Sequence, residues 1–106
     1  MMAEEKYNKE VIERYIKDSD QKPLVLIFTA PWISQSIIVD VITEKLITAA
    51  PYVNFVTIDT DQDEELAEEY FISKLPSFVV IVKHQIVAKR SGTFSKKNVL
   101  DVLNSL

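Results

Sequence analysis

Two runs of apolar residues constrain the fold of this chain more than any other feature of its sequence. They cover residues 24–28 (LVLIF) and 78–82 (FVVIV), and neither contains a polar side chain. A strand with one face in water alternates apolar and polar residues, whereas a strand covered on both faces is apolar throughout. The runs therefore predict central strands of a sheet with helices on both faces. Each run is far shorter than the about 20 apolar residues of a membrane-spanning helix, so we expect no membrane crossing.

Helices are predicted where apolar residues recur at a spacing of three or four. The predicted helices span residues 8–19, 32–49, 62–72 and 95–104. In the first two, the residues expected to face the core are Val11, Ile12, Tyr15, Ile16, Ile37, Ile38, Val41, Ile42 and Leu46. In the last two, they are Leu66, Ala67, Tyr70, Phe71, Val99, Leu100 and Leu103.

The first and last of these helices also carry signals for their beginnings. Asn8 and Ser95 are predicted N-caps, because their side-chain oxygens can accept hydrogen bonds from free amides of the first turn. The pairs Tyr7 with Ile12 and Phe94 with Val99 have the spacing of hydrophobic staples.

Two further strands complete the predicted order of elements, αβαβαββα. Residues 53–58 alternate apolar and polar, and residues 86–90 follow 77–82 after a connection short enough for a hairpin. Helices between strands imply parallel crossovers, and the final hairpin adds an antiparallel edge. We therefore expect an α/β fold in one domain over residues 1–106. It is a three-layer α/β/α sandwich whose mixed sheet has four strands, or five if residues 3–7 pair at an edge.

The composition of the 106 residues excludes several classes of protein. The chain has no cysteine, which leaves no disulfide, no thiolate nucleophile and no sulfur-ligated metal or iron–sulfur site. A net charge of -4 argues against binding to nucleic acid, because affinity for a phosphate backbone comes from cationic side chains. The first residues lack the apolar stretch of a secretory signal, so we expect a cytoplasmic protein. We expect no cofactor.

Seven acidic side chains follow one another without a basic residue among them. They are Asp59, Asp61, Asp63, Glu64, Glu65, Glu68 and Glu69. The first three have the spacing that begins a calcium-binding loop, but Glu64 and Tyr70 stand where such a loop needs glycine and glutamate. We therefore favour a solvated helix face and predict no metal site. Weak binding of a divalent cation and docking to a basic partner are the alternative interpretations.

Three segments of the sequence together resemble the thioredoxin family. They are residues 28–32 (FTAPW) ahead of a helix, 75–78 (LPSF) at the start of the hairpin, and 91–92 (SG) before the last helix. The resemblance covers about residues 8–106 and implies the thioredoxin fold, with a cis peptide bond before Pro76. Gly92 is the only glycine of the chain, and we expect it where the backbone approaches closely or φ is positive.

The chain departs from this family at the residues that carry its chemistry. Thioredoxins continue after the tryptophan with Cys-Gly-Pro-Cys, where this sequence has Ile33-Ser34-Gln35-Ser36. The first cysteine of the family attacks a disulfide as thiolate and the second resolves the mixed disulfide. Ile33 carries no nucleophile, and the hydroxyl of Ser36 cannot close a disulfide. A buried aspartate that assists proton transfer in the family is replaced by Ile27. Dithiol–disulfide exchange is therefore excluded, and we expect no enzyme of this class.

The resemblance leaves a binding surface in place of a catalytic one. In thioredoxins, three loops line a shallow groove that holds an extended peptide. The matching residues here are Trp32, Ile33, Lys74, Leu75, Pro76, Ser91, Gly92 and Thr93. With Trp32 and Ile33 exposed beside a backbone edge, this groove would bind a protein or peptide partner by strand addition. We hypothesise non-covalent partner binding through it.

Other interpretations of the same residues stay open at this stage. Trp32 is as well explained by packing of the helix against the sheet. Ser34 and Ser36 fit helix capping, and His84 fits a solvated turn. A small-thiol site is the alternative function, in which the helix N-terminus, one of these serines and the Pro76 backbone hold glutathione. Residual disulfide reductase activity, the function that similarity to thioredoxins would assign, would require turnover of a disulfide substrate with an external reductant, and we expect none.

Overall fold

Four strands form the central sheet of the structure, a computed structural model that describes residues 9–106. The strands are β1 (Leu24–Thr29), β2 (Asn54–Asp59), β3 (Ser77–Val82) and β4 (Gln85–Ser91), in the spatial order β2-β1-β3-β4. β1 runs parallel to β2, whereas β3 is antiparallel to both β1 and β4. The expectation of parallel crossovers is therefore wrong for the connection from β2 to β3, which reverses the chain direction.

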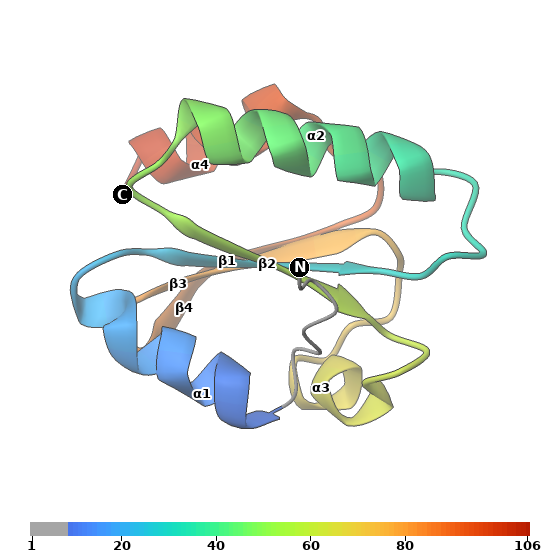
Figure 1. Ribbon diagram of the computed structural model, residues 1–106, viewed down its shortest axis with the longest axis horizontal. Coiled ribbons are helices and arrows are strands. Elements are labelled where there is room, and N and C mark those ends of the chain that lie inside the picture. Colours follow the sequence, from blue (N-terminus) through green and yellow to red (C-terminus); the bar gives the residue numbers. More distant parts are fainter. Residues whose placement is uncertain (1–8) are drawn as a thin grey trace.

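Helices cover both faces of this sheet, so the predicted three-layer architecture is confirmed (Figure 1). α2 (Ser36–Ala49) and α4 (Lys96–Asn104) lie on one face. α1 (Lys9–Lys17), which continues into a short 3-10 turn, and α3 (Glu64–Glu69) lie on the other. None of the helices in residues 9–106 is long and apolar enough to span a membrane. The predicted edge strand at 3–7, the Asn8 cap and the Tyr7 staple lie outside the described residues.

The two apolar runs of the sequence are the two central strands, and each supplies both cores. All six residues of β1 are buried. Val25 and Ile27 belong to the core under α2 and α4, together with Phe78 and Val80 of β3. Their sequence neighbours point the other way into the core under α1 and α3, which explains why neither run alternates with polar residues. The neighbours are Leu24, Leu26, Phe28, Val79 and Ile81.

α4 forms as its sequence predicts. The Ser95 hydroxyl accepts a hydrogen bond from the Asn98 amide at 3.1 Å, and the Asn98 side chain accepts one from the Ser95 amide at 2.9 Å. This reciprocal capping box satisfies two amides that the helix leaves free. Phe94 and Val99 both enter the core, and Leu103 follows one turn later.

α2 departs from its predicted orientation. Val39, Thr43 and Leu46 face the core, and the Thr43 hydroxyl donates to the Val39 carbonyl at 2.8 Å. Ile37, Ile38 and Val41, which the sequence analysis placed inside, are exposed, while Ile42 is partly buried. The helix also begins at Ser36, four residues later than predicted. The apolar residues of α2 therefore do not all serve the core of this chain.

Candidate functional site

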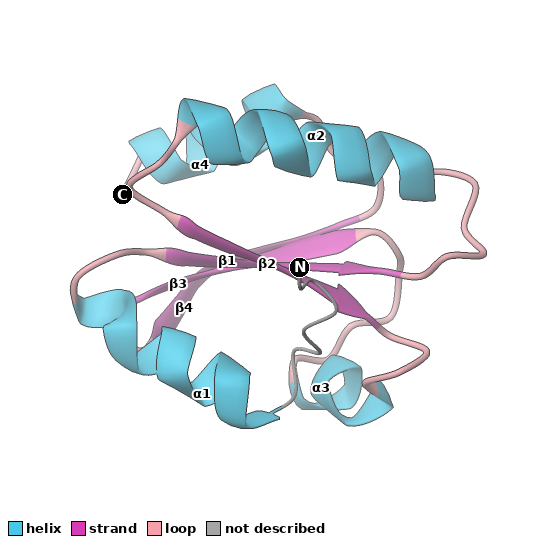
Figure 2. Ribbon diagram, viewed as in Figure 1, coloured by secondary structure: helices cyan, strands magenta, loops and turns pink. Residues whose placement is uncertain are grey.

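The loops that carry the sequence motifs gather at one end of the sheet, on the right in Figure 2. β1 and β2 are parallel, so both end there, and the antiparallel β3 begins there. β4 ends at the same side because Ser77 pairs with Ser91. This topology collects the segments after β1 and β2, before β3 and after β4. Together with Ser91, the last residue of β4, these segments include every residue of the predicted groove.

A cavity of about 330 Å³ lies between the loop after β1 and the loop before β3. The residues that line it are Trp32, Ile33, Thr60, Ala67, Ile72, Ser73 and Leu75. Three residues of the predicted groove thus meet in one hollow. The sequence analysis missed Thr60, Ala67, Ile72 and Ser73, which carry no motif and enter the cavity because α3 and its flanking segments pack beside the β1 loop.

Trp32 projects from this site into solvent, since 69% of its surface is exposed. Its indole Nε1 donates a hydrogen bond to the Asp61 carboxylate at 3.1 Å. Asp61 lies in the segment after β2, where its own amide donates to the Asp59 carboxylate at 2.8 Å. The packing role considered for Trp32 is therefore wrong, because the ring is held at the surface by a hydrogen bond. One acidic residue of the cluster, Asp61, orients the tryptophan.

Pro76 and Gly92 lie next to each other across the loops before β3 and after β4. The Leu75–Pro76 peptide bond is cis, and the Gly92 amide donates to the Pro76 carbonyl at 2.9 Å. The Ser77 hydroxyl donates to the Lys74 carbonyl and closes the turn that contains the proline. Gly92 has a φ of 92°, and a Cβ built on it would meet nothing within 4 Å. Of the two expectations for this glycine, positive φ rather than close approach is the reason.

The residues after β4 line a second cavity of about 230 Å³. Ser91, Gly92 and Thr93 share it with Arg90, Phe94 and residues of α4. Six of the eight predicted groove residues are thus divided between two hollows, one beside Trp32 and one beside α4, whereas Lys74 and Pro76 line neither of them. Pro76 connects them through its hydrogen bond to Gly92.

Comparison with known proteins agrees with this geometry. The family model for thioredoxin matches residues 2–105. The chain belongs to the thioredoxin family. It is similar to a thioredoxin H-type of Fagopyrum esculentum, with 32% identity over 76% of this chain and 70% of that protein. Mitochondrial thioredoxin-3 of Saccharomyces cerevisiae is 34% identical over 73% of this chain, and the match spans 59% of its length. The structure of Fasciola hepatica thioredoxin superposes with a TM-score of 0.83 at 26% identity, over 91% of both chains.

The positions that hold cysteines in thioredoxins are built differently in this member of the family. Ile33 is buried, with 9% of its surface exposed, so the expectation of an exposed isoleucine is wrong. Its amide donates to the Ala30 carbonyl at 3.3 Å, and its carbonyl accepts from the Ser36 amide at 3.1 Å. Ile33 thus forms the floor of the cavity beside Trp32. Ile27, at the position of the family's aspartate, is fully buried in the core under α2.

Neither serine of this segment caps α2. The N-cap residue is Gln35, which makes no capping hydrogen bond through its side chain. The Ser34 hydroxyl donates to the Gln35 side chain at 3.1 Å instead, and Ser36 is already the first helical residue. The capping interpretation of Ser34 and Ser36 is therefore wrong.

Phe71 adds an exposed aromatic residue that the sequence analysis placed in the core. It follows Tyr70 after α3, has a φ of 55°, and exposes 81% of its surface. The Lys89 ammonium holds this backbone by donating to the Tyr70 and Phe71 carbonyls at 2.8 and 2.7 Å, and it lies 5.7 Å from the Phe71 ring centroid. Tyr70 is buried, and this burial, together with the charge of Glu69, raises the pKa of its phenol. The left-handed backbone turns Phe71 away from the core that its neighbour enters.

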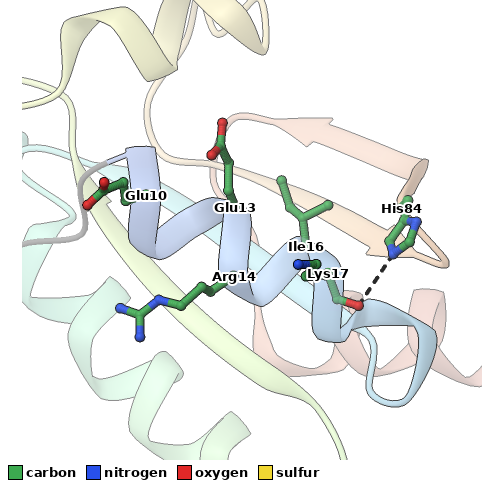
Figure 3. A pocket seen from close by; sticks show the side chains of 6 residues that line it. All are labelled: Glu10, Glu13, Arg14, Ile16, Lys17 and His84. Carbon is green, nitrogen blue, oxygen red and sulfur yellow. Dashed lines mark hydrogen bonds between the residues drawn. The ribbon is translucent and has the colours of Figure 1, made fainter.

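A third cavity, of about 410 Å³, lies along α1 at the opposite end of β3 (Figure 3). His84, in the turn between β3 and β4, reaches the end of α1, where its Nε2 lies 3.3 Å from the Lys17 carbonyl and 3.5 Å from the Asp20 carboxylate. The turn position predicted for His84 is confirmed. These contacts tie the hairpin to α1, and the cavity shares no residue with the site around Trp32. Within residues 9–106 no cluster of three or more histidine, aspartate or glutamate side chains is arranged to hold a metal ion.

Proposed function

We propose that this thioredoxin-family protein carries out no dithiol–disulfide exchange and binds a protein or peptide partner non-covalently through the groove around Trp32 and Pro76. The observation that carries the proposal is the pair of residues at the family's cysteine positions. Ile33 is a buried apolar residue with no titratable group. Ser36 is a helical residue whose amide donates a hydrogen bond to the Ile33 carbonyl. Catalysis by attack of a thiolate has no group to perform it.

The cavity beside Trp32 supports the binding half of this proposal. It combines an exposed indole, the apolar side chains of Ile33, Ile72 and Leu75, and a few polar groups at its rim. The hydrogen bond from Trp32 to Asp61 fixes the ring before a partner arrives, which lowers the entropy lost on binding. Tryptophan is one of the residue types enriched among those that dominate the energy of an interface.

The loop before β3 supports an extended partner. The Leu75 amide and carbonyl make no hydrogen bond within the described part of the chain, residues 9–106. An extended peptide that pairs with these two groups would add a short strand beside Pro76, and its side chains would alternate between the cavity and solvent.

The binding half is tested by selecting peptides from a displayed random library against the immobilised chain. We expect selected peptides to lose at least tenfold in affinity with Trp32→Ala, the loss typical of a tryptophan hot spot. Tyr52→Ala is the matched control, because Tyr52 is an aromatic residue with 53% exposure outside the site, and it should leave affinity unchanged. Equal affinity for wild type and Trp32→Ala would reject the groove as the binding surface.

The chemical half is tested by reduction of insulin with dithiothreitol as the external reductant. We expect the wild-type chain to give the rate of the reductant alone, and the Ile33→Cys/Ser36→Cys double variant to exceed it, since it restores both thiols on the family's fold. Saturable binding of glutathione, followed through Trp32 fluorescence, would instead support a small-thiol site. Turnover by the cysteine-free chain contradicts the proposal outright.

A further inference from the structure

The solvent-facing side of α2 is apolar along its first two turns. Ile37 exposes 75% of its surface, Ile38 55% and Val41 46%. A helix turns by about 100° per residue, so these three side chains lie within one face of roughly 100°. Amphipathic helices at a protein surface place polar residues on this side, and helices that are apolar all round are covered on all sides. The α2 face, defined by Ile37, Ile38 and Val41, is thus built like an interior surface.

A row of negative charge borders the α2 face. Asp40 and Glu44 are four residues apart, so they follow one another along the helix on the side of Ile37. Both residues are exposed, and neither carboxylate takes part in an ion pair or side-chain hydrogen bond within residues 9–106. Two like charges at this spacing destabilise an isolated helix. A surface that complements both rows would therefore place apolar side chains beside basic ones.

We propose that the α2 face is a docking surface for an amphipathic helix of another protein, with an apolar row beside a row of lysine or arginine. The apolar row would cover Ile37, Ile38 and Val41 as helices pack on one another through residues three and four apart. The basic row would meet Asp40 and Glu44, as charges that flank an apolar seam do in coiled coils. This surface lies outside the Trp32 groove, so the inference goes beyond the proposed function.

Charge favours such a helix over a second copy of this chain packed antiparallel. When two copies of α2 pack antiparallel about a twofold axis, the same flank of each helix meets, so Asp40 and Glu44 would face their own equivalents.

The inference is tested with a labelled two-heptad peptide of leucine and lysine, patterned as an amphipathic helix, and its leucine–glutamate counterpart. Binding is followed by fluorescence anisotropy at low ionic strength. We expect the lysine peptide to bind and the glutamate peptide to bind at least tenfold more weakly. Ile37→Ser/Val41→Ser should weaken the lysine peptide about tenfold, and Asp40→Asn/Glu44→Gln about threefold while keeping side-chain shape.

Two further variants separate this surface from others. Ile47→Ser is the matched control, because Ile47 lies on the same helix with 53% exposure but outside the α2 face, and it should change nothing. Trp32→Ala should also leave the lysine peptide unaffected, so failure here and failure of the groove are told apart. Absent binding, equal binding of both peptides, or equal loss with Ile47→Ser overturns the inference. A dimer in sedimentation that Ile37→Ser/Val41→Ser dissolves would overturn it in favour of a second copy.

Discussion

α2 and α4 pack on the same face of the sheet (Figure 1), yet they divide their apolar residues differently. α4 buries Val99 and Leu103 and presents mostly polar side chains to water. α2 buries Val39 and Leu46 and presents isoleucine and valine to water as well. α4 also begins with a capping box, whereas the N-cap of α2 makes no side-chain hydrogen bond. The residues of α4 thus satisfy both its packing and its N-terminus, whereas α2 exposes an apolar face that no part of residues 9–106 covers.

The difference between α2 and α4 shows when the spacing of apolar residues fails to predict which side of a helix is buried. In α4 the apolar residues occupy one face only, so their spacing alone gives the orientation. In α2 the apolar residues occupy nearly the whole circumference, and two different stripes fit the same periodicity. The sheet accepts the stripe that contains the smaller Val39 and Thr43, and the isoleucine-rich stripe remains outside.

The largest expected difference in stability is between substitutions on the buried side and on the exposed side of α2. Leu46 is fully buried, so Leu46→Ala should lower the free energy of unfolding by about 3 kcal/mol through lost burial and a cavity. Ile37→Ala removes a similar side chain that is already in water, and we expect a change within about 0.5 kcal/mol. Urea unfolding of both variants measures the difference. Similar losses for the two would show that Ile37 packs against this chain and that the α2 face is not free.

The loops at the site offer the same kind of contrast in their backbone. After β4 the positive φ falls on Gly92, whereas after α3 it falls on Phe71. A side chain in the left-handed region costs about 1–2 kcal/mol. Gly92→Ala should therefore destabilise the protein by about 1 kcal/mol, although there is space for the methyl group. Phe71→Gly should stabilise it by a similar amount, measured by thermal unfolding. A destabilised Phe71→Gly would indicate that the ring's contact with Lys89 outweighs the backbone strain.

The N-terminal caps of α2 and α4 also differ, with a smaller expected effect on stability. Ser95→Ala removes the hydroxyl that accepts from the Asn98 amide, which should cost about 1 kcal/mol. Ser36→Ala alters the first residue of α2, whose hydroxyl caps nothing, and should be nearly neutral. Gln35→Asp would supply α2 with the missing cap and should stabilise it by a few tenths of a kcal/mol or more. A loss for Ser36→Ala equal to that for Ser95→Ala would contradict the assignment of the caps.

The sequence predicted the strands and α4 because their signals are local, whereas it predicted the direction of β3 relative to β1 and β2 wrongly. Two unbroken apolar runs required burial on both faces, and Ser95 was recognisable as an N-cap next to the staple pair of Phe94 and Val99. Within the site, the sequence predicted only the residues that belong to recognisable motifs. Trp32 and Pro76 lie in the predicted region, whereas the bond from Trp32 to Asp61 joins residues 29 apart in sequence. The spacing of apolar residues does not predict a contact between polar groups so far apart in the sequence. The burial of Ile33 likewise depends on the turn between β1 and α2, which the prediction replaced with helix.

Tyr70 is buried, whereas Phe71, the next residue, is exposed. The burial of Tyr70 can be tested by the pH dependence of stability. Burial, together with the charge of Glu69, raises the pKa of the Tyr70 phenol above its ordinary value of 10.0. The folded chain therefore keeps this proton at pH values where the unfolded chain has lost it. The stability linked to that proton is fully present below about pH 10 and is lost as the pH rises through the folded pKa.

Replacing Tyr70 by phenylalanine keeps most of the buried ring and removes its titration. We expect Tyr70→Phe to lose less stability than wild type as the pH rises above about 10, because the remaining alkaline dependence comes from other groups. Tyr52→Phe is the control, since Tyr52 is exposed and should leave the wild-type dependence unchanged. Denaturant unfolding across this range measures both. If Tyr70→Phe and wild type lose stability in parallel, the phenol is as accessible to water as its neighbour Phe71, and the division between the two residues is wrong.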